Sequence, residues 1–78
     1  MKQYHITWEI PKINKIHDYD GSLDDLDSIF VYGYNMWPYE AIPEISSGMK
    51  KGQTASYNFP GTDEKITVTA LEDTFLPF

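Results

Sequence analysis

Carboxylates and aromatic rings are the side chains of this sequence best suited to chemistry or recognition, and both gather in the middle of the chain. Residues 16–49 contain no lysine and seven acidic residues, namely Asp18, Asp20, Asp24, Asp25, Asp27, Glu40 and Glu44. Half of the ten residues from 30 to 39 are aromatic. Carboxylates steer a protein toward basic surfaces, and Trp and Tyr supply strong interface contacts. The pattern therefore indicates recognition of a protein partner.

Two aromatic residues stand out as candidate anchors of such an interface. Trp37 and Tyr39 flank Pro38, outside any regular element that the sequence predicts, so we expect their rings to be exposed. Phe30 and Tyr32 are expected in the core instead. The predicted partner-binding set consists of Trp37 and Tyr39 as the central contact, with the seven acidic residues around them.

The charge of the chain favours a particular class of partner. The net charge is −6, with six lysines and no arginine, which argues against direct binding of DNA or RNA because the guanidinium group is a principal phosphate and guanine ligand. Basic surfaces on proteins are most often those that bind nucleic acid, and an acidic protein can occupy such a surface with carboxylates in place of phosphates. We therefore predict a stoichiometric inhibitor or nucleic-acid-mimicking decoy of a nuclease, polymerase or similar enzyme.

Nuclease immunity proteins and phage-encoded inhibitors of host enzymes share this general chemistry. The likeness lies in composition, and no stretch of the chain matches a family motif. An alternative prediction is a structural or assembly subunit, for instance of a virion, that uses its strand edges and the apolar tail Phe75, Leu76 and Phe78.

A calcium-binding module is a lesser alternative. Asp18, Asp20 and Ser22 have the one-three-five spacing of oxygen ligands in an EF-hand loop. The sixth and twelfth positions of that loop require Gly and Glu, but this chain has Leu23 and Ile29 there.

Catalytic motifs are missing from the sequence. There is no cysteine and no Gly-x-Ser-x-Gly elbow, and the five glycines are scattered singly, so neither nucleophilic catalysis nor phosphate binding by a glycine loop is indicated. His5 is expected to be an ordinary surface histidine. We predict no enzyme activity and no cofactor, although a fold could still bring a carboxylate pair together.

The elements that position these residues are predicted to be mainly β. A chain of 78 residues is expected to form a single domain over 1–78, with a small antiparallel sheet of about four strands and one short helix near 22–28. Residues 3–10 alternate polar and apolar side chains, which indicates a half-buried strand ending at Pro11. Residues 11–21 read as a loop in which Ile13 and Ile16 return toward the core.

The later part of the chain predicts two further sheet regions. Ser22 followed by Asp25 suggests a helix start, and Ser28 to Trp37 is rich in β-branched and aromatic residues, which predicts a strand in the middle of the sheet. Residues 38–48 are expected to be a long loop or a short turn of helix. Residues 54–59 and 65–71 alternate in the manner of a hairpin, with its turn at 60–64.

Targeting signals are not predicted. No apolar run reaches the length of a signal-peptide core or a membrane-spanning helix. The sequence therefore predicts no membrane contact and a cytoplasmic protein, in the host cytoplasm or inside a virion if it is encoded by a phage.

Overall fold

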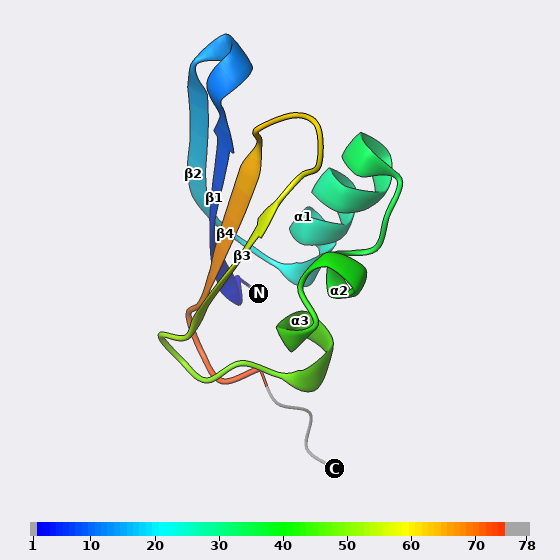
Figure 1. Ribbon diagram of the computed structural model, residues 1–78. Helices are drawn as coiled ribbons and strands as arrows, with labels where there is room; N and C mark the ends of the chain where they lie inside the picture. Colours follow the sequence, from blue (N-terminus) through cyan, green and yellow to red (C-terminus); the bar gives the residue numbers. More distant parts are fainter. Residues whose placement is uncertain (1, 75–78) are drawn as a thin grey trace.

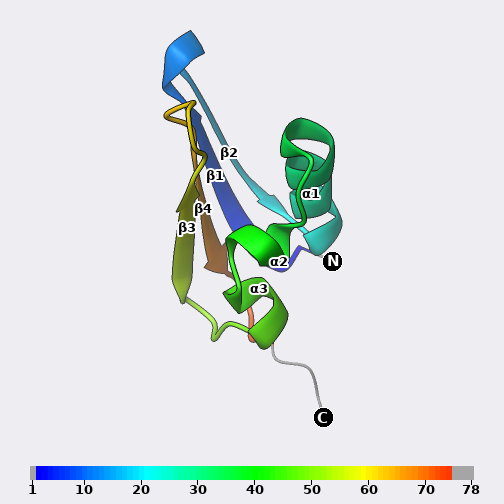
Figure 2. The ribbon, with the colours of Figure 1, turned by 45° about the vertical axis from the view of Figure 1, so that its right-hand side comes forward.

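Four antiparallel strands form one sheet in the order β2-β1-β4-β3, and short helices cover one of its faces (Figures 1 and 2). This computed structural model describes residues 2–74. The strands are β1 (Tyr4–Ile10), β2 (Lys15–Gly21), β3 (Thr54–Asn58) and β4 (Lys65–Ala70). The prediction of a mainly β fold with four antiparallel strands and a short helix is confirmed.

Strand β1 forms at the position that its alternating sequence predicts. Tyr4 and Ile6 point into the core, while His5 and Thr7 point to the opposite face of the sheet. Because β1 pairs with β2 on one side and β4 on the other, it is a central strand whose backbone groups have partners on both edges.

The hairpin of β3 and β4 is also confirmed. Ala55 faces Val68 in the register, and both are buried. The Phe59 amide donates to the Glu64 carbonyl at 2.9 Å and closes the connection, in which Gly61 has a φ of +78° that suits glycine. The polar residues Thr54, Ser56, Thr67 and Thr69 lie on the face of the sheet away from the helices.

The predicted loop at 11–21 is wrong. Residues Pro11–Ile13 form a short 3-10 turn, η1, and residues 15–21 are strand β2, which pairs with β1 along its whole length. Six of the seven residues of β2 are exposed. The strand therefore lacks the alternation of buried and exposed residues from which a strand is predicted. Ile13 and Ile16 do not return to the core, since their exposed fractions are 57% and 67%.

The predicted central strand at Ser28–Trp37 is also wrong, because this segment continues the helix. Helix α1 (Leu23–Asp27) is followed by a wider π-helical turn, η2 (Ser28–Tyr32), and helical residues 33–34. The Ser22 amide donates to the Asp25 carboxylate at 2.7 Å, as the predicted helix start requires. Asn35, with a φ of +54°, ends the helix.

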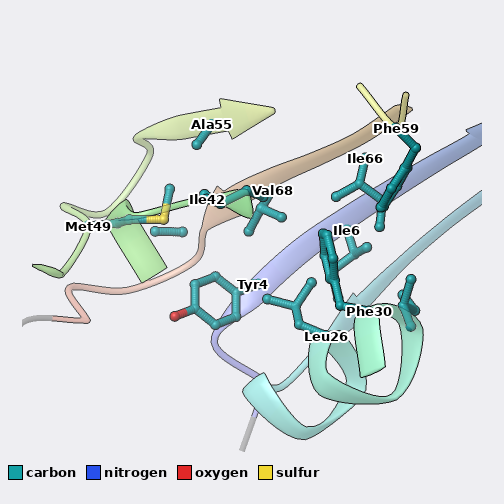
Figure 3. Packing of buried hydrophobic residues seen from close by; sticks show 12 residues of the cluster. Tyr4, Ile6, Leu26, Phe30, Ile42, Met49, Ala55, Phe59, Ile66 and Val68 are labelled. Atoms are coloured by element: carbon teal, nitrogen blue, oxygen red, sulfur yellow. The ribbon is translucent and has the colours of Figure 1, made fainter. Parts of the chain in front are cut away.

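Helical spacing decides which side chains of this segment are buried. Leu26, Ile29 and Phe30 pack on the sheet, whereas Tyr32 is 88% exposed and so the prediction that it belongs to the core is wrong. Seven of the ten residues in 28–37 are aromatic or apolar, and a run of this kind fits a strand as well as a helix. Figure 3 shows the resulting core, with Phe30 and Leu26 facing Ile6 and Ile66.

Residues 38–48 contain two single turns of helix, as the sequence allowed. These are α2 (Pro38–Ala41) and α3 (Glu44–Ser47), and Ile42 between them is buried. The tail residues Phe75, Leu76 and Phe78 lie outside the described residues. Within residues 2–74, no helix is both long and apolar enough to cross a membrane.

Candidate functional site

A groove of about 410 Å³ lies on the helical side of the molecule, where the start of β1 meets α1, α2 and α3. We call it the aromatic groove. Its volume falls within the range of small-ligand and side-chain pockets in proteins. The lining residues that matter for the argument are Tyr4, Leu23, Asp27, Trp37, Pro38 and Tyr39.

The aromatic pair of the groove is held by a buried proline. Trp37 is extended (φ −82°, ψ 144°) and precedes the first residue of α2, the conformation that a residue before proline prefers. Pro38 is fully buried, and its carbonyl accepts the Ile42 amide at 2.8 Å. Trp37 and Tyr39 on either side of it are therefore fixed at the surface.

The two rings are accessible and nearly parallel. Trp37 is 49% exposed and Tyr39 is 50% exposed. Their ring centroids are 6.4 Å apart, with 15° between the ring planes. Leu23, which is 41% exposed, lines the same groove. Large apolar side chains that converge on a hollow in this way are typical of a binding site rather than of a scattered surface.

Asp27 supplies the carboxylate of the groove. Partial burial raises the pKa of Asp27, and the neighbouring charge of Asp24 raises it further. Both effects make the charged carboxylate less favourable in the free protein. A cation placed beside Asp27 would stabilise the charged carboxylate and so oppose both effects.

Other predicted acidic residues stand on the helices around this groove. Asp24 and Glu40 are exposed on α1 and α2, and Glu44 is half-buried at the start of α3. None of these three lines the groove itself, although Glu40 and Glu44 directly adjoin the lining residues Tyr39 and Ile45 in the sequence. Within residues 2–74, no lysine forms an ion pair with a carboxylate. The acids of the helical side are therefore not neutralised by ion pairs with lysine.

The remaining predicted acids lie elsewhere or have another partner. Asp25 caps helix α1 through its contact with the Ser22 amide. Asp18 and Asp20 project from β2 on the open sheet face, which we define as the face opposite the helices. There they flank His5, with Asp20 accepting a hydrogen bond from His5 Nδ1 at 2.7 Å and Asp18 facing Nε2 at 2.5 Å.

His5 is thus more constrained than the ordinary surface histidine that the sequence predicts. The hydrogen bond to Asp20 and the charge of Asp18 raise the pKa of His5. Thr7 also donates to Asp18 at 3.0 Å. The sequence contained a signal for this contact, since alternate residues of two paired strands share a face, but the signal required knowing that β2 is a strand.

The three residues with EF-hand spacing, Asp18, Asp20 and Ser22, do not lie together in a loop. Asp18 and Asp20 lie on a regular strand and engage His5, while Ser22 precedes the helix. Among residues 2–74, no three His, Asp or Glu side chains are grouped to hold a metal ion.

Sequence reasoning anticipated the exposure of Trp37 and Tyr39 but missed the walls of the groove. Tyr4 and Leu23 are remote from Trp37 along the chain, and only the packing of α1 and α2 on β1 brings them together. A second hollow of about 500 Å³, lined by Lys12, Thr62, Asp63 and Glu64 among others, has no aromatic ring in its lining.

No family model matches the chain, and no curated protein or solved structure matches it significantly.

Proposed function

We propose that this protein is a binding module that docks the aromatic groove on a basic surface of a partner protein. The observation that carries the proposal is the meeting of Trp37, Tyr39 and Asp27 in one groove. Two half-exposed rings offer apolar area and π faces for a lysine or arginine side chain, and Asp27 offers the counter-charge. Aromatic anchors in a pocket are the usual centre of a protein interface.

The surrounding charge supports association with a cationic partner. Asp24, Glu40 and Glu44 form the acidic surroundings of the groove, and uncompensated carboxylates accelerate encounter with a basic surface. Asp18, Asp20 and Asp25 have other partners in the fold. In this proposal they contribute to the net charge, and the contact is made by Trp37, Tyr39, Asp27 and the acids of the three helices.

The partner class that fits best is an enzyme with a nucleic-acid-binding surface. Such surfaces are basic because they neutralise phosphates. The protein would act as a stoichiometric inhibitor or decoy by covering that surface, with its carboxylates taking the place of phosphates. The small size of the groove means that a few residues near Trp37 would carry most of the binding energy.

A capture experiment with matched variants tests this function. Wild-type protein, Trp37→Ala and Tyr32→Ala are immobilised and exposed to host lysate, and bound proteins are eluted with rising salt. Tyr32 is the control because its ring is exposed outside the groove lining. We expect a partner held by wild type and Tyr32→Ala, lost from Trp37→Ala and released as salt screens the charges.

The decoy activity is then tested on the captured protein itself. One molar equivalent of wild-type protein should abolish its DNA or RNA binding, whereas Trp37→Ala should leave that binding intact. A captured protein that binds wild type and Trp37→Ala equally, or that still binds nucleic acid in the complex, would refute the proposal.

A further inference from the structure

The connection between β1 and β2 carries an exposed apolar and basic surface that the proposed function does not use. We call residues 11–16 the hairpin tip. It contains Lys12 and Lys15 but no carboxylate, and Ile13 and Ile16 are more than half exposed. The pairing of β4 with β1 ends at Glu9, so the tip projects beyond β4, as Figures 1 and 2 show.

We propose that the hairpin tip of one copy of this chain docks in the aromatic groove of a second copy. This inference rests on the proposed function, because the same groove is used. Ile13 and Ile16 would cover the exposed rings of Trp37 and Tyr39, and Lys15 would reach Asp27, since Lys12 lines the second hollow beside Asp63 and Glu64. The apolar and charged groups of the two surfaces are complementary in kind, as interface surfaces require.

A copy cannot seat its own tip in its own groove. Tyr4 lines the groove, and Ile10 at the other end of β1 lies directly before the tip. Seven extended residues separate these ends by roughly 20 Å, and the paired strands are too stiff to fold back. The contact is therefore between molecules, and because it joins two different surfaces, copies add head to tail.

Net charge does not prevent this association at ordinary ionic strength. Each copy carries a net charge of −6, so two copies repel at long range. At about 0.1 M salt the screening length is about 10 Å, and charges beyond the contact are largely screened. The local attraction between the lysines of the tip and the acids of the groove then dominates the encounter.

Mixing two complementary variants tests the contact. Trp37→Ala damages the groove and leaves the tip intact, while the double variant Ile13→Thr, Ile16→Thr damages the tip and leaves the groove intact. Threonine keeps the β-branched shape at these exposed positions, so the hairpin should persist. Sedimentation velocity at about 0.1 M salt, from about 20 μM to about 1 mM, suits the weak affinity of a small interface.

The expected results differ clearly between the samples. Wild type should gain mass steadily with concentration, and each variant alone should associate at least about tenfold more weakly. An equimolar mixture of the two variants should form a one-to-one complex, because one intact tip meets one intact groove. Tyr39→Ala serves as a second groove variant if Trp37→Ala does not fold, and a charge swap pairing Lys15→Glu with Asp27→Lys should restore binding that either change alone weakens.

The outcomes that overturn self-docking differ from those that overturn the proposed function. Wild type that remains monomeric at the highest concentration, or variants that do not combine on mixing, would overturn self-docking. If self-docking fails in this way and a capped peptide of alternating lysine and leucine still binds wild type but not Trp37→Ala, the proposed function stands while this inference fails. If that peptide binds both proteins equally, the groove is not a binding site and both proposals fail.

Discussion

The carboxylates of residues 18–20 and of residues 24–27 are close in sequence, but they lie on opposite sides of the sheet in different chemical settings. Asp18 and Asp20 on the open sheet face share the imidazole of His5. Asp27 on the helical side lines an apolar groove beside Asp24, and its pKa is raised. The first pair is satisfied within the fold, whereas Asp27 is the carboxylate that we propose a partner contacts. An acidic stretch therefore does not act as one patch.

The two groups of acids lie on opposite sides of the sheet because the helix 23–34 packs on one of its faces. Substituting a core residue of that helix tests this packing. Phe30 is fully buried, with its ring centroid 5.3 Å from that of Phe59. Phe30→Ala should lower the free energy of unfolding by about 3–5 kcal/mol, because it removes apolar contacts and leaves a cavity. Urea denaturation measures this loss. Tyr32→Ala on the same helix should be nearly neutral, and similar losses for both would contradict the helical packing.

Substitution of Trp37, an exposed ring of the aromatic groove, tests whether the helical side and the open sheet face differ in partner binding. Trp37→Ala should weaken binding of the captured partner by about 30-fold or more, corresponding to about 2 kcal/mol for a hot-spot residue. Isothermal titration calorimetry measures the change, and a urea curve shows whether the fold is kept. Asp18→Asn on the open sheet face is the comparison, with an expected change of less than about threefold. Equal losses for the two variants would remove the distinction between the faces.

Asp25 is a carboxylate with a structural role, in contrast to Asp27, for which we propose a binding role. Its carboxylate accepts the Ser22 amide at 2.7 Å, so Asp25→Asn should cost about 1 kcal/mol of unfolding free energy with little effect on partner binding. Asp24→Asn is the matched control, since Asp24 is exposed on the same helical turn. Thermal melts compare the two. A larger loss for Asp24→Asn would show that the cap is not what stabilises this helix start.

The smallest expected effect is a pH dependence that belongs to the open sheet face. The pKa of folded His5 is raised by Asp20 and Asp18, so its stabilising contribution is complete below its unfolded pKa of about 6.5 and is lost as pH rises through the higher folded value. The urea midpoint of wild type should therefore fall relative to His5→Gln as pH rises from about 6. Parallel pH profiles for the two proteins would argue against a charged His5 between these acids.

Local patterns in the sequence predicted the elements whose faces differ in polarity. The alternation around Tyr4 and Ile6 predicted β1, the alternation at 54–59 and 65–71 predicted the β3–β4 hairpin, and Ser22 with Asp25 predicted the helix start. Each of these signals is local, because a half-buried element displays its period in its own residues.

The predictions were wrong for segments whose two faces do not differ in polarity. Strand β2 is exposed along nearly its whole length, so it forms by pairing with β1 and not by burying a pattern of its own. In the segment 28–34, apolar residues fall at both strand and helix spacing, and burial of Phe30 with exposure of Tyr32 was decided by tertiary packing.

The candidate site was predictable only in part for the same reason. The exposure of Trp37 and Tyr39 followed from their place beside Pro38, but the groove required Tyr4, Leu23 and Asp27 from separate elements to converge. The prediction from sequence also placed the seven carboxylates in one binding surface. Strand register and helix capping, which depend on pairing at a distance, divided them.

The most direct test of the groove as the binding face uses the two indoles of the protein. The indole N–H of Trp8 is buried, whereas the Trp37 ring is half exposed in the groove. In a ¹H–¹⁵N NMR titration with the capped lysine-leucine peptide, the account predicts that the Trp37 indole signal shifts saturably while the Trp8 signal stays in place. The same peptide with serine in place of lysine should have little effect. An unmoved Trp37 signal, with shifts instead around His5, Asp18 and Asp20, would contradict the account.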